Sequence, residues 1–547
     1  MADFEKILQA AGDFGLFQKL LLFALSFPNL LIPFHVTSLI FHQASMSSSF
    51  HHCNTNWILT VGPNLTKKEQ LSLTVPQLLD GSFSMCEMFA PVNWSLENIR
   101  QFGLNETTSC MHGYIHDTSY YEATIVSDFD LVCDQAFLVG VAQTTFLTGI
   151  LVGSLLFGPF SESIGRQRTT QISVVFMIIA MYVTGLSPNV YVYMASQFII
   201  GVSFGGFRIN SVILATEWIG MTKRAYAVCL GQVTAALGQC VLIGVVYFIR
   251  DWRTAQFIMG APSFFTVIYI WFLPESARWL LEQGRTEESK KAVLKAAAFN
   301  KRTVPDALLV KLSKEKVIET GGIKSLLSSS VLRKYFLTLI YAWAALNLAY
   351  TSLSLNVGKF GMGIFTTQLI FGLTEIPAHI LCVWLSELAG RKPSLMSTLL
   401  LGGTTCLVSV FIPHDKAPAV VALVTTGRFF MNWAGSICYV YTQELFPTSV
   451  RQTATGLAYI VAKMGGMLSP LLNLLGVFHE IIPTVVLSIF SISAGALAFL
   501  LPETKRTELP DSMEEAERKR NQTMRNQAKT EDNGITMDQS YMKSTKI

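Results

Sequence analysis

Long apolar runs recur along the whole chain and constrain its fold more than any other feature. Residues 140–160, 171–187, 334–356 and 480–501 are each long enough to cross about 30 Å of hydrocarbon. Because a bilayer offers backbone groups no water to bind, such runs must form helices, whose hydrogen bonds are internal. Only 14% of the residues are charged, against roughly 25% in soluble domains. The sequence therefore predicts an all-α membrane protein.

The apolar runs divide the chain into twelve predicted spans. A short polar segment at 1–15 runs into the first span without a cleavable signal, so we expect a signal-anchor helix. The other polar segments are a loop at 41–135, a linker at 274–334 and a charged tail at 502–547, which we expect to be disordered. The predicted spans are 16–40, 137–160, 170–187, 190–216, 226–249, 254–273, 335–357, 364–386, 394–413, 417–441, 453–476 and 480–501.

The loop and the linker differ in charge and in cysteine content. The loop has three basic residues, whereas residues 275–334 have thirteen, so the positive-inside rule places the linker and both termini in the cytoplasm. Four cysteines and three N-x-[ST] sequons lie in the loop, which suits an oxidising compartment, although four cysteines allow three pairings. We therefore predict a multi-pass plasma-membrane protein with a glycosylated, disulfide-bonded extracellular loop. The residues concerned are Asn64, Asn93, Asn105, Cys53, Cys86, Cys110 and Cys133.

Three short motifs occur twice, at nearly the same separation. The duplicated residues are Gly165 and Gly390, Glu217 and Glu444, and Glu275 and Glu503, which are 225, 227 and 228 residues apart. Each lies at a predicted cytoplasmic helix end. The repeat predicts two homologous six-helix halves, at 16–273 and 335–501. A parallel duplication of this kind is the arrangement of major facilitator transporters, whose halves move against each other around a central cavity.

Several other functional classes lack their motifs in this sequence. A TVGYG selectivity filter is absent, as is a phosphate-binding G-x-x-x-x-G-K-[ST] loop, so neither a potassium-type channel nor an ATP-driven pump is expected. No nucleophile–base pair or metal-ligand cluster lies at a plausible membrane depth. The net charge of +4 is too mild to indicate a nucleic-acid partner. We expect no enzyme activity, cofactor or metal.

Several longer motifs are shared with a known family. They are the Pro-Glu-Ser-Ala-Arg-Trp-Leu segment at 274–280, the Gly-Arg loops at 165–168 and 390–393, the Glu-Leu-Phe-Pro-Thr-Ser-Val-Arg segment at 444–451, and the end of the loop at 129–134. Over essentially its whole length the chain resembles the organic ion transporters of solute carrier family 22. It is most similar to the organic-anion branch, near members that carry nicotinate and urate or, in sperm, riboflavin. The resemblance implies a twelve-helix major facilitator fold with a large extracellular loop between the first two helices.

Charged residues at the cytoplasmic helix ends are candidates for an inner gate. Charge-assisted bonds between the halves can close the cavity when it faces outward and break when it opens inward. The alternative is that these residues only anchor helices and satisfy helix ends. Ser163 and Gln197 replace arginines that are common in the family, which affects the details of gating. The candidates are Glu162, Arg166, Glu217, Arg224, Arg391, Glu444 and Arg451.

Lys463 is the leading candidate for substrate contact. It lies in the middle of the eleventh span, and ionisable residues inside spans are functional candidates by default. The resemblance places it where anion carriers have arginine and cation carriers have aspartate. A lysine at this position favours an anionic substrate, held by charge in a low-dielectric cavity. The alternative is a lysine neutralised by burial or paired with a carboxylate.

Three further residues complete the main candidate set. His379 occupies a position where anion carriers usually have a basic residue, and it is either a pH-sensitive cation or a neutral polar group. Tyr350 matches a cavity tyrosine of the family. Arg208 either faces the cavity or replaces the basic residue missing at Gln197. We expect Glu375 to pair locally.

Weaker candidates would supply aromatic and polar contacts to a planar substrate. For each of them, helix packing is the stronger interpretation. The terminal Thr545-Lys546-Ile547 fits a PDZ-type ligand. The weaker candidates are His35, Gln232, Gln239, Asn432, Trp433 and Tyr439.

Together these features predict a secondary transporter of small organic anions, such as planar carboxylates, urate-like metabolites or vitamins. Transport would proceed by facilitated exchange with a counter-anion or coupling ion. One alternative is a carrier of riboflavin or of another neutral, zwitterionic or cationic solute. The other is a non-transporting membrane receptor or scaffold, which the charged residues inside the spans oppose.

Overall fold

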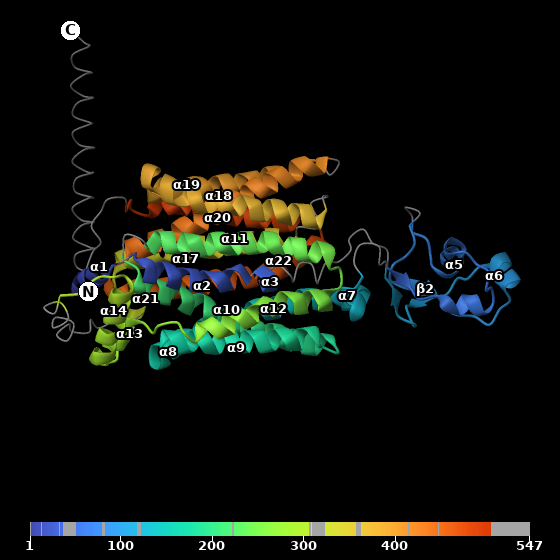
Figure 1. The fold of residues 1–547 in the computed structure, drawn as a ribbon. Coiled ribbons are helices and arrows are strands. Elements are labelled where there is room, and N and C mark those ends of the chain that lie inside the picture. The colour runs from blue at the N-terminus through green and yellow to red at the C-terminus, as the bar shows by residue number, and fades with distance from the viewer. Residues whose placement is uncertain are drawn as a thin grey trace, which may run out of the picture.

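A computed structural model shows a bundle of long helices with a small separate domain at one end (Figure 1). We refer to this end as the loop end, and to the opposite end, which carries α13 and α14, as the linker end. The residues described are 2–12, 14–31, 33–36, 51–78, 82–116, 122–220, 224–305, 308, 323–356, 363–413, 416–446 and 448–504.

The N-terminal half consists of long helices that follow the predicted spans. Close crossings hold them together: a Cβ built at Gly153 of one helix would overlap the backbone of Val202 on another, so only a glycine permits this approach. The helices are α2 (Leu16–Leu31), its short continuation α3 (Pro33–Val36), α8 (Phe137–Ile164), α9 (Arg166–Gly185), α10 (Val190–Trp218), α11 (Arg224–Phe248) and α12 (Trp252–Ile270).

The C-terminal half repeats this pattern around its own apolar core. One predicted span, at 453–476, has a local irregularity at Leu468 between two successive helices, but its backbone stays helical and the Leu468 N–H still bonds to the Met464 carbonyl at 3.2 Å. The helices are α17 (Ser330–Leu355), α18 (Ile364–Ala389), α19 (Arg391–Ser409), α20 (Ala417–Leu445), α21 (Thr448–Met467), α22 (Ser469–Leu474) with the 3-10 turn η6 (Leu475–Val477), and α23 (Ile481–Leu497) with η7 (Ala498–Leu500).

Each predicted span thus overlaps one described helix or successive short ones, and residues 37–40 of the first span lie outside the described part of the chain. Eight helices in the described part of the chain are long and apolar enough to cross a membrane, judged by length and composition. Many side chains on their outer faces are large, apolar and exposed, as a lipid-facing surface requires.

The small domain at the loop end is formed by residues 51–116, which we name the loop domain. Two short antiparallel pairs organise it: His52 pairs with Ile115, and Met88 pairs with Thr108. Among the described residues its elements are β1 (His52–Cys53), η1 (Asn56–Thr60), α5 (Lys67–Thr74), β2 (Glu87–Phe89), α6 (Leu96–Phe102), β3 (Thr107–Ser109) and β4 (Tyr114–Ile115).

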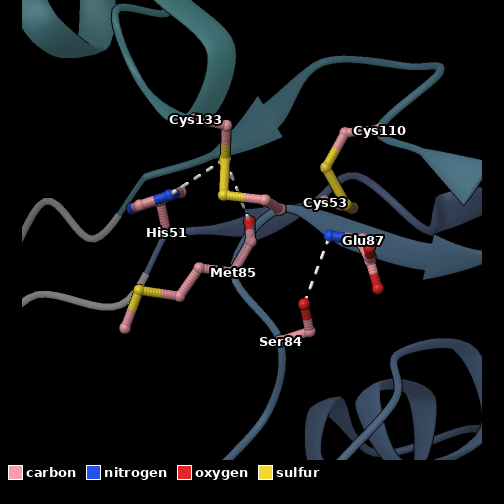
Figure 2. The surroundings of a disulfide bond; sticks show 8 residues. His51, Cys53, Ser84, Met85, Glu87, Cys110 and Cys133 are labelled. Atoms are coloured by element: carbon pink, nitrogen blue, oxygen red, sulfur yellow. Dashed lines mark hydrogen bonds between the residues drawn. A yellow bond between two sulfur atoms is a disulfide. The ribbon is translucent and has the colours of Figure 1, made fainter. Parts of the chain in front are cut away.

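Two disulfides settle the pairing that the sequence left open. Cys53 is bonded to Cys110 within the loop domain, and Cys86 is bonded to Cys133. His51 lies beside the second bond, with its Nε2 atom 3.8 Å from the Cys133 sulfur (Figure 2). Because Cys133 lies just before α8, the second disulfide ties the loop domain to the first residues of the bundle.

The segment after the loop domain is fixed to the N-terminal half. It contains α7 (Ile125–Asp128) and η2 (Cys133–Gln135). The Asp128 carboxylate accepts hydrogen bonds from the Trp252 indole at 2.9 Å and from the Arg253 guanidinium at 3.1 Å. Arg253 also donates to the backbone carbonyls at the end of α9, at Gly185 and Ser187. One arginine therefore joins the loop segment to two helices of the same half.

The linker is divided between the two halves. Its first part, α13 (Ala277–Glu282) and α14 (Thr286–Phe299), packs with the N-terminal helix α1 (Ala2–Ala11). Asn300 fixes this arrangement, because its amide donates to the Ala11 carbonyl at 2.9 Å and accepts from the Phe17 N–H at 2.8 Å. The later α16 (Ile323–Ser328) instead contacts α17 and α21 of the C-terminal half.

The halves meet through two antiparallel helix pairs, α11 with α18 and α8 with α21. In the first pair, the Gln239 amide donates to Gln368 Oε1 at 3.1 Å. In the second, the Thr148 hydroxyl lies 3.2 Å from the Met467 sulfur. Both contacts lie in the half of the bundle nearer the loop end.

Candidate functional site

A cluster of charged residues, Glu275, Arg166 and Glu217, lies at the linker end of the N-terminal half, and we call it a polar corner. The Glu275 carboxylate accepts hydrogen bonds from the backbone N–H groups of Arg166 at 3.0 Å and of Gln167 at 3.1 Å, at the first residues of α9. A carboxylate at this position satisfies free N–H groups and complements the helix dipole. The Arg166 side chain is buried and lies 3.6 Å from Glu217 of α10.

The C-terminal half has the same corner. Glu503 accepts from the backbone N–H groups of Arg391 at 2.9 Å and of Lys392 at 3.1 Å. The Arg391 guanidinium donates through Nε and Nη2 to Glu444, at 3.1 Å and 3.0 Å. The repeat detected in the sequence is therefore a repeat of hydrogen-bonded structure.

These corners differ from the expected bonds between the halves. The Arg166–Glu217 and Arg391–Glu444 pairs each join helices of one half, and no ion pair between described residues joins the halves at the linker end. The Glu162 side chain is exposed, while its backbone carbonyl accepts from the Trp279 indole at 2.8 Å. The side chains of Arg224 and Arg451 lie outside the described residues. A role in gating remains a prediction for all seven candidates.

The helix faces that meet between the halves can be identified from their contacts. On α18, Gln368 and Gly372 contact α11, and Glu375 and His379 continue the same face at helical spacing. On α21, Met467 contacts α8, and Lys463 lies one turn before it on the same face. The chain thus places both Lys463 and His379 at the interface between the halves.

Arg428 of α20 forms a short ion pair within the C-terminal half, beside this interface. Its Nη2 atom lies 2.6 Å from Glu375 Oε1 and donates to the Tyr350 hydroxyl at 2.9 Å. Tyr350 in turn donates to the same Glu375 oxygen at 2.9 Å. The guanidinium lies over the rings of Tyr350 and Phe371, at 4.6 Å and 4.4 Å from the centroids. Three helices, α17, α18 and α20, thus meet at one buried ion pair.

His379 lies one turn from this pair and is held as a neutral ring. Its Nδ1 atom lies 3.0 Å from the Ser436 hydroxyl, and its Nε2 atom lies 3.2 Å from the Asn432 amide nitrogen. Since Asn432 donates to Nε2, that nitrogen has no proton, and Nδ1 donates to Ser436. The geometry supports the neutral alternative for this histidine.

Arg208 of α10 brings positive charge to the interface from the other half. Its guanidinium donates to the Gln232 carbonyl of α11 at 2.8 Å. Arg208 thus lies beside α11, the helix that contacts α18 of the other half. That Arg208 faces the cavity stays a prediction.

Lys463 is partly buried, and its amine lies 4.9 Å from the centre of the Tyr459 ring. Among the described residues no carboxylate forms an ion pair with it. Packing places Lys463 near the level of Ala344, since Gly465 of α21 adjoins Ala344 of α17. Ser352 of α17 bonds to Asn473 further along, so the two helices are parallel. The alternative of a carboxylate-paired lysine finds no support in the described contacts.

The weaker candidates divide between the interface and helix packing. Gln239 bonds across the halves to Gln368, whereas Gln232 bonds to Arg208 within the N-terminal half, and Asn432 bonds to His379 within the C-terminal half. Trp433 stacks on Phe430 at 6.3 Å within the C-terminal half. Tyr439 is partly buried on α20. The His35 side chain and the terminal Thr545-Lys546-Ile547 lie outside the described residues. The sequon residues Asn64, Asn93 and Asn105 are all exposed on the loop domain.

The sequence analysis missed Arg428, although the signal was present. It lies eleven residues after the start of the predicted span at 417–441, in the apolar segment Val424-Thr-Thr-Gly-Arg428-Phe-Phe. The rule that selected Lys463 applies equally to this arginine. Glu375 does not pair within its own helix but across to α20.

The interface as a whole has an excess of positive charge. Arg208, Arg428 and Lys463 contribute three positive charges and Glu375 one negative charge, a surplus of two, with His379 neutral. Aromatic rings and amide groups lie beside these charges. Such a surface can hold the negative group of a small planar solute between the halves.

Comparisons with known proteins agree with this geometry. The family model described as "Sugar (and other) transporter" matches residues 92–516. Solved structures of the proton:xylose symporter XylE share the fold, one with a TM-score of 0.57 at 17% identity over 91% of this chain and 99% of that one. Another, in a partially occluded inward open conformation, has a TM-score of 0.58 at 15% identity, over 90% of this chain and 100% of that one. XylE is a major facilitator protein, so the predicted fold is confirmed.

Curated relatives are similar over nearly the full chain. Solute carrier family 22 member 13 of Homo sapiens is 38% identical over 94% of both chains. Member 14 of Homo sapiens is 32% identical over 95% of this chain and 89% of its own. Member 6-B of Xenopus laevis is 32% identical over 94% of both. The chain therefore belongs to solute carrier family 22, a family of membrane transporters with the major facilitator fold.

Proposed function

We propose that this protein transports small organic anions, such as planar carboxylates, urate-like metabolites or vitamins, by exchange through alternating access. The observation that carries the proposal is the surplus of positive charge between the halves, from Arg208, Arg428 and Lys463. An intramembrane cation without a paired carboxylate is unfavourable unless a bound anion compensates it. Lys463 has this character among the described residues.

The proposal includes an orientation in the plasma membrane. The loop domain would be extracellular, where its disulfides are stable and its exposed sequons are accessible for glycosylation. The linker and both termini would be cytoplasmic. Treatment with peptide N-glycosidase, compared between wild type and single Asn64→Gln, Asn93→Gln and Asn105→Gln variants, tests this orientation.

Uptake measurements test the substrate class. Cells expressing wild type, Lys463→Ala, Lys463→Asp and Lys463→Arg would be given radiolabelled nicotinate, urate, riboflavin and a cationic dye, at surface levels measured by biotinylation. We expect wild type and Lys463→Arg to take up the anions, and the other two to lose at least about tenfold, since a buried charge contact contributes more than about 1.4 kcal/mol. Equal anion uptake by all four proteins would contradict the assignment of Lys463.

A neutral planar solute such as riboflavin is the second candidate. The observation in its favour is that His379 is neutral and that Glu375 already neutralises Arg428. Wild-type uptake of riboflavin alone, unchanged in the Lys463 variants, would support this alternative.

A further inference from the structure

The Arg428–Glu375 pair is buried to a degree that structural stability does not explain. Arg428 is 3% exposed and Glu375 is 7% exposed. Removing two charges from water is so unfavourable that a buried ion pair often contributes no net stability compared with apolar residues. The pair joins two helices of the C-terminal half, and Glu375 lies one turn from Gly372, which contacts α11 of the other half. This position beside the contact between the moving halves indicates a role in the transport cycle.

Arg428 is also incompletely hydrogen-bonded. Both of its contacts, with Glu375 and with the Tyr350 hydroxyl, use Nη2. Its Nε and Nη1 atoms are buried and have no hydrogen-bond partner among the described residues. A guanidinium has five N–H donors, and a buried donor without a partner is energetically unfavourable. The site therefore has unused capacity for a second carboxylate.

The groups that face Glu375 come from four helices. Arg428 of α20 and Tyr350 of α17 bond to it, and His379 follows it by one turn on α18. Cys240 of α11 lies beside Gly372, which precedes Glu375 by one turn on the same face. Cys240 belongs to the N-terminal half. Of these groups, Arg428 alone is positively charged, because His379 is neutral. Glu375 therefore lies next to the contact between α18 and α11, where the halves meet.

We propose that Glu375 binds a proton when a substrate carboxylate binds Arg428, so that anion and proton cross the membrane together. This inference rests on the proposed function, because it requires an anionic substrate. In the empty carrier, Glu375 neutralises Arg428. In the loaded carrier, the substrate carboxylate neutralises Arg428 and Glu375 is a neutral acid.

Charge balance explains why the proton is required. The empty site contains one positive and one negative charge, and the loaded site contains the same two, with the proton forming an O–H bond on Glu375. If Glu375 stayed ionised, two carboxylates would compete for one guanidinium, and like charges at such short range cannot both stay ionised in a buried site. Both forms of the carrier therefore avoid an uncompensated buried charge as the halves move.

Proteoliposomes containing the purified full-length protein provide the test, with liposomes lacking protein subtracted. The first measurement is accumulation of radiolabelled nicotinate and urate with the outside about two pH units more acidic than the inside, where one proton per anion supports up to roughly 100-fold accumulation. The second is counterflow, the exchange of internal unlabelled for external labelled anion at equal pH. The third is acidification of the lumen on addition of the anion, reported by a trapped pH-sensitive dye.

Three variants distinguish a loss of proton coupling from a loss of folded protein. Glu375→Gln mimics the protonated acid, so we expect it to keep counterflow and lose gradient-driven accumulation and lumen acidification. Glu375→Asp retains a titratable carboxylate and is expected to keep all three. Glu480→Gln removes an exposed carboxylate at the loop end, outside the interface, and should match wild type.

Each other outcome overturns a distinct claim. Wild type that exchanges the anions but shows neither gradient-driven accumulation nor lumen acidification would overturn proton coupling and leave the proposed function intact. Glu375→Gln that keeps gradient-driven accumulation, or loses counterflow in folded protein, would overturn the assignment of the proton to Glu375. Wild type that transports neither anion under any condition would contradict the proposed function itself. If Glu375→Gln does not fold, lumen acidification by wild type and Glu375→Asp still decides the coupling.

Discussion

The Glu503 carboxylate accepts a hydrogen bond from the backbone N–H of Arg391 at 2.9 Å, and the identical arrangement joins Glu275 to Arg166 in the other half. In both halves a residue after the last helix thus satisfies the N-terminus of the third. The contact therefore joins the end of the last helix of each half to the start of its third helix. It explains why the two glutamates recur at an almost constant separation in the sequence.

Removing either carboxylate should destabilise its own half. We expect Glu503→Ala and Glu275→Ala each to lose about 1–2 kcal/mol, because each removes hydrogen bonds to a helix N-terminus and the charge that complements its dipole. Thermal unfolding of the detergent-purified protein, followed by tryptophan fluorescence, measures the loss. Glu480→Ala is the matched control, since Glu480 precedes α23 without a side-chain capping bond. Equal melting temperatures for all three variants would contradict this role.

The glycines before these helix starts should resist substitution. Gly165 and Gly390 have φ angles of +104° and +96°, and a Cβ on either would overlap the glutamate carboxylate beside it. We expect Gly165→Ala and Gly390→Ala to cost about 1–3 kcal/mol each, from backbone strain and displaced hydrogen bonds. Gly158→Ala, at a helical position with open space around it, should leave the melting temperature unchanged. Tolerance of alanine at 165 and 390 would show that the carboxylates move freely.

His379 should contribute less to charge selectivity than its position in the sequence suggests. Both ring nitrogens bond to side chains of α20, so the ring is neutral. We expect His379→Gln to keep the ratio of anion to riboflavin uptake within about threefold of wild type, since no charge is removed. Lys463→Gln, in contrast, should lower that ratio strongly. A collapse of the ratio in His379→Gln would show that the histidine is charged during transport.

Acidification should lower the free energy of unfolding of the loop domain. Burial, followed by the nearby charges of His116 and His52, lowers the pKa of His51 below its ordinary value of 6.5. Burial also lowers the pKa of His52, with Lys67 and His116 as further causes. The folded domain therefore binds fewer protons than the unfolded chain, so its stability is complete above pH 6.5 and decreases as the pH falls toward the lowered values.

Hydrogen exchange at the β1–β4 pair measures this loss. After correction for the intrinsic pH dependence of exchange, protection of these amides should decrease as the pH falls below about 6.5, because the histidines of the unfolded chain bind protons in that range. A variant with His51→Gln and His52→Gln should lack this loss of protection. Identical pH profiles for wild type and variant would exclude the histidines as the cause.

The Cys86–Cys133 disulfide should stabilise the connection between the loop domain and the bundle. It closes a sequence separation of 47 residues, for which the chain-entropy relation gives about 4 kcal/mol. We expect a Cys86→Ser, Cys133→Ser double variant to show increased proteolysis within the loop domain and reduced surface expression. Limited proteolysis of membranes, with Cys406→Ser as a control at a buried thiol outside the loop, tests this expectation. Unchanged cleavage would show that the Asp128 contacts suffice.

The sequence predicted the helical fold well because lipid imposes one rule on every span. Apolar length and the three repeated motifs located the helices, the two halves and the corners around Glu275 and Glu503. The irregularity of the eleventh span at Leu468 was not foreseen. The sequence does contain its cause, because Pro470 has no N–H to donate to the carbonyl of Gly466 one turn earlier.

The candidate site was predicted less completely, because charge pairing depends on which helices are neighbours. Spacing along the chain cannot show that Arg428 and Glu375 meet, since they are on different helices and 53 residues apart. For the same reason, Arg166 and Arg391 were expected to bridge the halves, although each bonds within its own half. Lys463 and Arg208 could be selected because a charge inside an apolar run is visible without a fold.

The attachment of the loop segment through Asp128 and Arg253 has a practical consequence. Every contact described for it is made with helices of the N-terminal half. A nanobody or fluorophore bound to the loop domain would therefore move together with the N-terminal half. Paired with a label on the C-terminal half, it would report the angle between the halves while leaving the interface itself unmodified.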